Sequence, residues 1–232
     1  MKRLISMATP NIANDCAELI ANHREYAAAQ GYEYECHQEK HRDFMDFHPV
    51  YSRLGFLLDA LDDSEFAVWA DADVAFMDHT WDIASLLDHG KVDIGRYVPG
   101  NPTPVLEKSP GVWLAGYNQA NWPTSYLCFG LVVFRANWLS KSFLREVIHR
   151  ARQNPEIDNA REQYYVYDVL AQINYAGTRM CSPSEIGCFS PELWHDGNRW
   201  KRGYPTVHLA GGDWPKRNKV FHQQYKPLVK RG

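Results

Sequence analysis

The stretch FAVWADADVAFMD, residues 66–78, places Asp71 and Asp73 one residue apart within an otherwise apolar run. The residues before Asp71 are typical of a short, buried strand. A carboxylate at the end of a buried strand is costly unless a cation or hydrogen-bond donors hold it. The two acidic residues therefore predict a binding site at the point where this strand ends.

Strand-like and helix-like patterns alternate along the chain. Strands are predicted at 3–9, 32–38, 66–71, 126–134 and 206–210, and helices at 14–31, 48–61, 140–153 and 161–173. This alternation predicts an α/β fold with a mostly parallel central sheet flanked by helices. We find no internal repeat or Gly/Ser-rich linker, so residues 1–232 are expected to form a single domain. In such sheets ligands bind beyond the carboxyl ends of the strands, where Asp71 and Asp73 stand.

Composition narrows the class of protein further. The net charge is -3, which gives no reason to expect nucleic acid as a partner. The N-terminal MKRLISMATPN is too short for a secretory signal, and no later stretch is apolar enough for a transmembrane segment. The five cysteines include no CxxC pair and are typical of reduced thiols. We expect a soluble, cytoplasmic protein.

Two carboxylates one residue apart can bind a single hard divalent cation. Mg²⁺ is commonly held by one or two carboxylates together with phosphate oxygens of a substrate. Mn²⁺ accepts the same oxygens and also binds imidazole. The alternative is an exposed acidic pair in a turn. The apolar strand before Asp71 favours the metal.

Four segments of the chain resemble the glycosyltransferases of family 34, which have the GT-A fold. They are YSRLGFLLDALDDSEFAVWADADVAFMD (51–78), YLCFGLVVFRANWLSKSFLREV (126–147), REQYYVYDVL (161–170) and VHLAGGDWPKR (207–217). The sequence departs from that family at Cys128, where an Asn is usual, and at Glu162, where an Asp is usual. We also expect no membrane anchor of the kind common in the Golgi members of that family.

The resemblance implies a metal-dependent glycosyltransferase. Such an enzyme moves a sugar from a nucleotide-diphosphate donor, here expected to be a UDP-sugar, to a saccharide or glycan acceptor with retention of configuration. It implies Mn²⁺, or Mg²⁺, bound by Asp71, Asp73 and His208. Considered alone, His208 is more typical of a structural histidine on a strand, and Gly211, Gly212 and Lys216 after it favour a turn that faces a diphosphate.

The resemblance also assigns roles to further residues. At the reacting centre it implies Gln163 beneath the anomeric carbon and Glu162 on the sugar hydroxyls, and Asp168 is a further catalytic candidate. The nucleotide-sugar donor is expected to contact Ala8, Thr9, Arg53, Asp71, Gly211 and Lys216. Arg217 is an alternative to Lys216 at the phosphates. Arg53 could instead be a surface arginine, and the basic pair could be a solvated helix start.

Residues 99–124 are rich in Pro, Gly, Asn and Trp and predict a long functional loop. We expect this loop to act as a lid or to bind the acceptor. Indole rings stack on sugars, so an acceptor platform is expected from some of the loop tryptophans. The candidates are Trp113, Trp122, Trp194, Trp200 and Trp214. The alternative for each is a place in the core.

Two other functions are compatible with parts of the sequence. A haloacid-dehalogenase-like phosphohydrolase also has an apolar strand ending in D-x-D, but its motif requires Thr or Val where Ala75 stands, and it lies near the N-terminus. A non-catalytic sugar-binding protein on a transferase fold would keep the architecture without the chemistry. The joint presence of Asp71, Asp73, His208 and Gln163 favours an enzyme.

Overall fold

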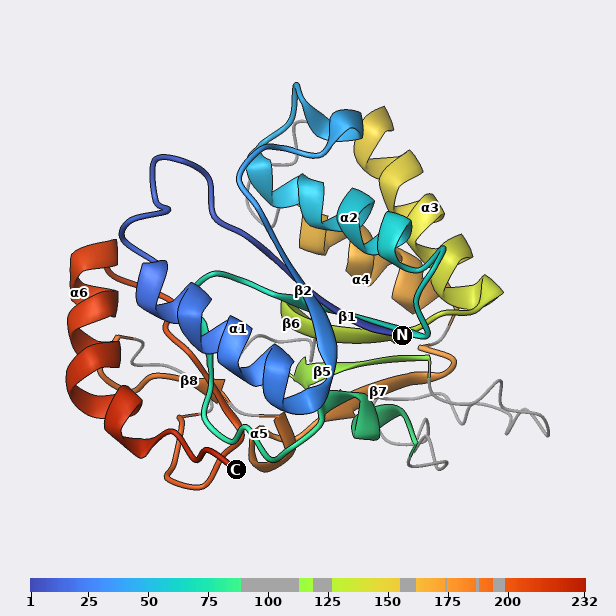
Figure 1. Ribbon diagram of the computed structural model, residues 1–232. Helices are drawn as coiled ribbons and strands as arrows, with labels where there is room; N and C mark the ends of the chain where they lie inside the picture. Colours follow the sequence, from blue (N-terminus) through green and yellow to red (C-terminus); the bar gives the residue numbers. More distant parts are fainter. Residues whose placement is uncertain (89–112, 119–126, 155–161, 174, 187, 194–198) are drawn as a thin grey trace.

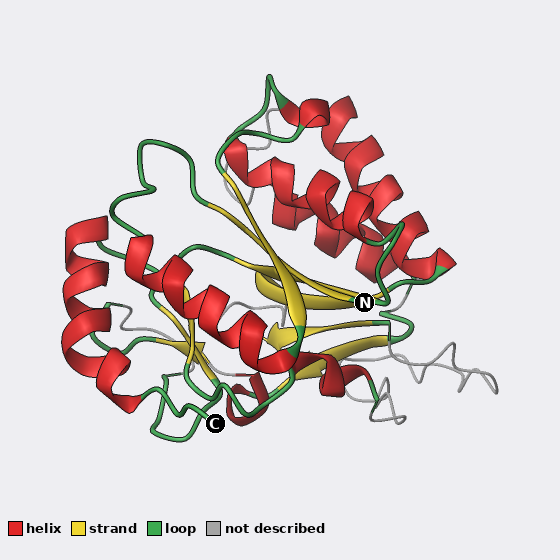
Figure 2. Cartoon of the chain, in the orientation of Figure 1, coloured by secondary structure: helices red, strands yellow, loops and turns green. Residues whose placement is uncertain are grey.

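The computed structural model describes residues 1–88, 113–118, 127–154, 162–173, 175–186, 188–193 and 199–232 (Figure 1). Its described part contains a six-stranded sheet with helices on both faces and a second sheet of three strands. The strands of both sheets are yellow in Figure 2, and the helices that cover them are red.

The large sheet has the strand order β2-β1-β3-β6-β5-β7. Its strands are β1 (Lys2–Met7), β2 (Tyr32–His37), β3 (Phe66–Ala70), β5 (Leu114–Asn118), β6 (Leu127–Arg135) and β7 (Thr178–Cys181). Three of the five pairings are parallel, and β6 runs antiparallel to both of its neighbours. The predicted α/β fold with a mostly parallel central sheet is confirmed.

One face of this sheet is covered by three helices, α2 (Ser52–Ala60), α3 (Trp138–Gln153) and α4 (Glu162–Gln172). A 3₁₀ turn, Pro49–Tyr51, precedes α2. Apolar residues at helical spacing, such as Leu54 and Leu57, pack into one core with β3, β6 and the other two helices. The register of α2 within this core fixes where Arg53 points.

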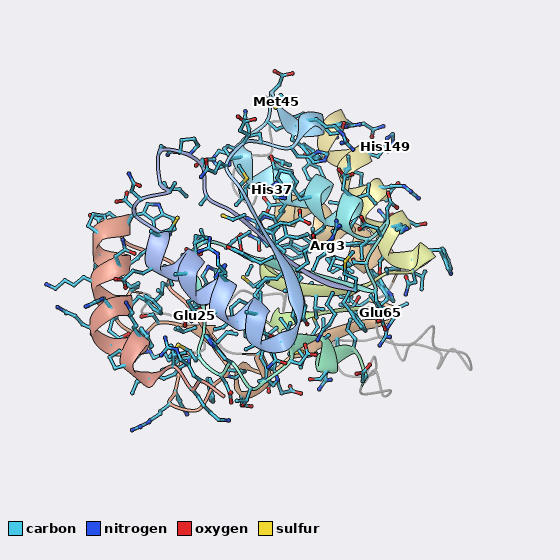
Figure 3. The ribbon with its side chains drawn as sticks, viewed as in Figure 1. Arg3, Glu25, His37, Met45, Glu65 and His149 are labelled. Carbon is cyan, nitrogen blue, oxygen red and sulfur yellow. The ribbon has the colours of Figure 1, made fainter. Side chains whose placement is uncertain are left out.

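The opposite face is covered by α1 (Ala17–Gln30) and a 3₁₀ helix, Ile83–Leu87. The helix α1 ends at Gly31, which has φ 69°, as the sequence predicts for a helix stop. Figure 3 labels Glu25 on α1 and His149 on α3, which belong to the two helical layers on either side of the sheet.

The second sheet consists of β4 (Val74–Phe76), β9 (Thr206–His208) and β8 (Cys188–Phe189). It packs against α6 (Trp214–Val220) and a π-helical turn (Phe221–Tyr225), which a 3₁₀ helix (Lys226–Leu228) follows. A further short helix, α5 (Pro183–Ile186), precedes β8. The chain leaves the large sheet at the end of β3 and enters the small one at β4, so residues 71–73 form the corner between the two sheets.

The prediction of one long loop over 99–124 is wrong for its central part. Residues Leu114–Asn118 form β5, which pairs with β6 and β7. Trp113 is 1% exposed, and its Nε1 donates to Ala176 O at 2.8 Å. This tryptophan is thus a core residue and no acceptor platform. Residues 99–112 and 119–124 lie outside the described residues.

No helix in the described ranges has both the length and the apolar character needed to cross a membrane. The described cysteine side chains, those of Cys16, Cys36, Cys128 and Cys181, are free thiols, as the sequence predicts.

A buried histidine makes stability depend on pH. His23 Nε2 donates to Val74 O at 2.6 Å, and its Nδ1 accepts from Ser6 Oγ at 2.8 Å, so the ring is neutral when folded. Burial lowers the pKa of His23 from 6.5 to about 4. The unfolded chain therefore binds more protons between these values, and folding is destabilised as the pH falls through that window.

We expect His23 to contribute roughly 2 kcal/mol to the loss of unfolding free energy between pH 7.5 and pH 5. Denaturant unfolding of the wild type and of His23→Gln at both pH values measures it. The variant should be less stable at pH 7.5 but lose clearly less stability on acidification. Equal losses in the two proteins would contradict the account.

Candidate metal and donor-binding site

The corner Asp71-Ala72-Asp73 is fixed by backbone hydrogen bonds to both sheets. Asp71 N donates to Gly130 O of β6 at 2.7 Å, and Val74 N donates back to Asp71 O at 2.9 Å. Leu209 N, which follows β9, donates to Asp73 O at 2.7 Å. The two acidic residues therefore occupy a rigid turn just beyond the end of β3, where the sequence predicts a site.

His208 reaches this corner through strand pairing. In the antiparallel β4–β9 ladder Val74 lies opposite His208, which places the imidazole beside the preceding Asp73. His208 Nε2 lies 3.1 Å from Asp73 Oδ1. One ligand atom each from Asp71, Asp73 and His208 lies within 4.8 Å of the others. Two carboxylates with one imidazole suit Mn²⁺, so the residues fit the predicted metal.

Gly130 provides the close approach that this cluster needs. A Cβ atom at this position would lie 2.7 Å from His208 Cε1 and 3.2 Å from Asp71 Oδ2. No separate role is predicted for Gly130 from the sequence. A lone glycine inside the apolar run 126–134 is the signal that could have drawn attention to it, since a glycine in a strand often marks a close contact.

Asp73 has a strongly cationic environment. Its Oδ1 faces His208, and its Oδ2 accepts from Arg217 Nη1 at 2.8 Å. Burial alone would raise the pKa of Asp73, but the charges of His208 and Arg217 outweigh it and lower the pKa to about 2. Burial alone would lower the pKa of His208, and the charge of Asp73 instead raises it well above its usual value. Asp73 is therefore a stable anion at neutral pH.

Asp71 has weaker compensation. Its Oδ1 accepts from Trp69 Nε1 at 2.7 Å and lies 3.2 Å from Arg53 Nη2. Burial and the negative charge of Asp73 raise the pKa of Asp71, and Arg53 only partly offsets them. Its side chain is 25% exposed. A divalent cation placed between the two carboxylates would relieve their repulsion.

Arg53 connects the acidic corner to α4. Its side chain is buried, its Nη1 donates to Phe129 O at 2.7 Å, and its Nε lies 3.4 Å from Glu162 Oε1. Glu162 is 1% exposed and so needs this cation. The alternative of a surface arginine is wrong. Gln163, the next residue of α4, accepts at its Oε1 from Phe129 N at 3.3 Å.

Asp168 is not brought to this cluster. Its carboxylate pairs with Arg150 of α3, which also pairs with Glu146. Asp168 lies about 1.7 turns after Glu162 on α4, so the two side chains leave the helix in different directions. Within the described residues its contacts are those of an ion pair between two helices.

A cavity of about 180 Å³ opens beside the acidic corner. It is lined by residues that include Met7, Thr9, Val50, Arg53, Trp69, Asp71, Asp73, Trp214 and Arg217. Thr9 thus borders the cavity as expected, whereas Ala8 is 3% exposed and its N donates to His37 O at 2.9 Å.

The basic residue that approaches the corner is Arg217, the alternative to Lys216. Lys216 is exposed, and its backbone N donates to Asp213 Oδ1 at the start of α6. Gly211 takes part through its carbonyl, which accepts from Arg217 Nε at 3.2 Å.

The remaining tryptophans divide between two environments. Trp214 lines the cavity, whereas Trp200 packs on the core of the second sheet against Tyr225. Trp122 and Trp194 lie outside the described residues. Of the candidate platform tryptophans that the structure describes, Trp214 is the one next to the predicted donor residues.

No family model and no curated protein matches the sequence. Solved structures match the fold over almost the whole chain. A glycosyltransferase involved in the glycosylation of the major capsid of PBCV-1 has 15% sequence identity, a TM-score of 0.67, and coverage of 95% of this chain and 98% of its own. The galactosyltransferase LgtC, in complex with donor and acceptor sugar analogues, has 14% identity, a TM-score of 0.55, and coverage of 97% and 93%.

A third similar structure is the bifunctional glycosyltransferase WbbM, with 12% identity, a TM-score of 0.54, and coverage of 91% of this chain and 46% of its own. The chain has the fold of the GT-A glycosyltransferases. The predicted likeness to that class is confirmed, and the fold gives the phosphohydrolase alternative no support. Membership of family 34 in particular stays a prediction.

Replacing Gly130 with Ala should damage the metal site without unfolding the protein, because the added Cβ would displace the His208 ring. We expect Mn²⁺ affinity to fall about tenfold or more, the scale of effect seen when the support of a metal ligand is disturbed. The Mn²⁺ affinity is measured by titration, with the electron paramagnetic resonance signal of the free ion as the readout.

Gly116→Ala is the matched control. The added Cβ would lie 2.8 Å from Leu127 Cδ1 on the neighbouring strand, so it would crowd the sheet to a similar degree. It would not contact any of the proposed metal ligands. The two variants should lose similar stability but differ in Mn²⁺ affinity. Equal affinities would show that Gly130 does not support the site.

Proposed function

We propose that this protein is a metal-dependent glycosyltransferase that uses a nucleotide-diphosphate sugar, with UDP as the expected nucleotide and Mn²⁺ or Mg²⁺ as the ion. The acceptor class is a saccharide or glycan. The observation that carries the proposal is the convergence of Asp71, Asp73 and His208 at one corner of a GT-A fold. Asp71 and Asp73 lie in the turn between the two sheets, and His208 lies in β9, 135 residues after Asp73.

The chemistry needs a counter-charge for the leaving diphosphate. A divalent ion supplies it when bound, so no protein group has to protonate the leaving group. Asp73 and His208 are the residues that would hold the ion most directly, because both are buried and rigidly placed. Asp71, held by Trp69 and Arg53, would contact both the ion and the donor.

The sugar is expected on the α4 side of the corner. Glu162 is oriented by Arg53, which also holds Asp71, so the sugar-binding and metal-binding groups are coupled by one buried cation. Gln163 lies at the start of α4 with its Oε1 on Phe129 N, and we propose it beneath the anomeric carbon. This placement is consistent with a retaining reaction.

The nucleotide is expected in the cavity on the other side of the corner. Met7 ends β1 and Thr9 follows it, whereas Val50 lies in the 3₁₀ turn before α2 and Arg53 in the first turn of α2. We propose that Ala8 and Thr9 lie against the base and ribose. Gly211 and Arg217 would face the phosphates, with Arg217 in the position first assigned to Lys216.

Asp73→Asn should abolish nucleotide binding that depends on the metal, because a neutral amide replaces the most strongly ionised ligand. In the wild type, UDP with Mn²⁺ at about a hundredfold excess over Kd should raise Tm by roughly 5–10 °C, and EDTA should remove the shift. Asp62→Asn, an exposed carboxylate paired with Lys141, is the control and should keep the full shift. A panel of nucleoside diphosphates and nucleotide sugars identifies the donor.

Gln163→Ala separates binding from turnover. We expect it to keep the thermal shift and to lose about a hundredfold or more of the rate at which UDP is released from the sugar nucleotide. Wild-type binding without any UDP release, with or without saccharide acceptors, would favour the non-catalytic sugar-binding alternative. No shift with any nucleotide would reject the proposed function.

A further inference from the structure

Both carboxylate oxygens of Asp73 already have a protein partner. Oδ1 lies 3.1 Å from His208 Nε2, and Oδ2 lies 2.8 Å from Arg217 Nη1. The two side chains of the Arg217 pair are mostly buried, with exposures of 19% and 12%. An ion pair shielded in this way is stronger than a solvent-exposed one. Arg217 thus neutralises the same carboxylate that the proposed ion needs.

Arg217 belongs to a short, well-defined segment, residues 211–220. It begins with Gly211 and Gly212, whose φ values of 87° and 70° require glycine, and continues into α6. Arg217 Nε donates to Gly211 O at 3.2 Å, and the guanidinium lies over the Trp214 ring at 4.8 Å. The guanidinium is therefore held in place by its own segment as well as by Asp73.

The segment also limits the space at the corner. Trp214 and Arg217 form part of the wall of the cavity of about 180 Å³. Small-molecule sites usually have volumes of about 300 Å³ or more. A diphosphate that binds in this cavity would therefore meet Arg217 directly beside Asp73.

We propose that Arg217 is a built-in substitute for the divalent cation, which occupies Asp73 Oδ2 until metal and nucleotide enter together. This inference rests on the proposed metal site. Arg217 competes with a metal ion alone for Asp73. When a diphosphate is present, its oxygens offer the displaced guanidinium a new anionic partner, for which its planar fork is well suited. Arg217 thereby couples the binding of the metal ion to the binding of the diphosphate.

The proposal predicts opposite effects of one substitution on two affinities. Arg217→Gln removes the competitor, so Mn²⁺ alone should bind about tenfold more tightly, the scale of a lost hydrogen bond between charged groups. With UDP present, the wild type should gain Mn²⁺ affinity, and the variant should lose most of that gain. The electron paramagnetic resonance signal of free Mn²⁺ reports both affinities, so no measurement of catalysis is needed.

Lys216→Gln is the matched control, because it removes the same charge from the adjacent, exposed residue, whose backbone N donates to Asp213 Oδ1 and is kept in the variant. It should leave both affinities within about twofold of the wild type. Arg217→Met is a second variant that keeps the apolar contact with Trp214, and it should behave like Arg217→Gln.

Tighter Mn²⁺ binding in both Arg217 variants, without a matching change in Lys216→Gln, supports the proposal. Unchanged or weaker binding of Mn²⁺ alone in the Arg217 variants overturns it while leaving the metal site intact. If the wild type and all variants fail to bind Mn²⁺, the metal site itself is rejected, and the inference fails with it.

Discussion

The strand β4 pairs with β9 through three residues on each side, and this short antiparallel ladder sets the position of His208. The same ladder begins directly after the turn that carries Asp71 and Asp73, so the carboxylates and the imidazole share one rigid frame. Gly130 on β6 supplies the backbone carbonyl that holds Asp71 and the open space that the His208 ring occupies. Without this strand pairing, His208 would not be held beside Asp73.

Charge compensation then divides the corner into two halves. Asp73 is held between His208 and Arg217, and its pKa is low despite burial. Asp71 shares Arg53 with Glu162, so one buried guanidinium joins the end of β3 to the start of α4. The nucleotide side and the sugar side of the proposed site are therefore linked through the two acidic residues. Arg53 is the residue through which a change on one side would reach the other.

The sequence is informative where patterns are long or where a residue type has one common use. The helix ending at Gly31 and the apolar strand before Asp71 were predictable from periodicity, and the resemblance to known transferases brought His208 to the same site. The strands β4 and β8 were too short to give a pattern. Trp113 and β5 were hidden in a stretch whose composition is typical of loops, because burial of Trp113 depends on β6, β7 and α3 packing around it. Neighbouring side chains on a helix point about 100° apart, so only one of Lys216 and Arg217 can face Asp73. Which of the two does so depends on the orientation of α6, which the sequence does not reveal.

The central claim is that Asp71, Asp73 and His208 hold a divalent ion that a nucleotide diphosphate shares. Diffraction from crystals grown with Mn²⁺ and UDP, recorded near the manganese absorption edge, tests it most directly. We predict an anomalous peak that places a manganese ion within bonding distance of Asp73 and His208. UDP phosphate oxygens should be its further ligands, and the Arg217 guanidinium should have moved away from Asp73 Oδ2. UDP bound without a peak at this corner, or a peak elsewhere with the Asp73–Arg217 pair intact, would contradict the account.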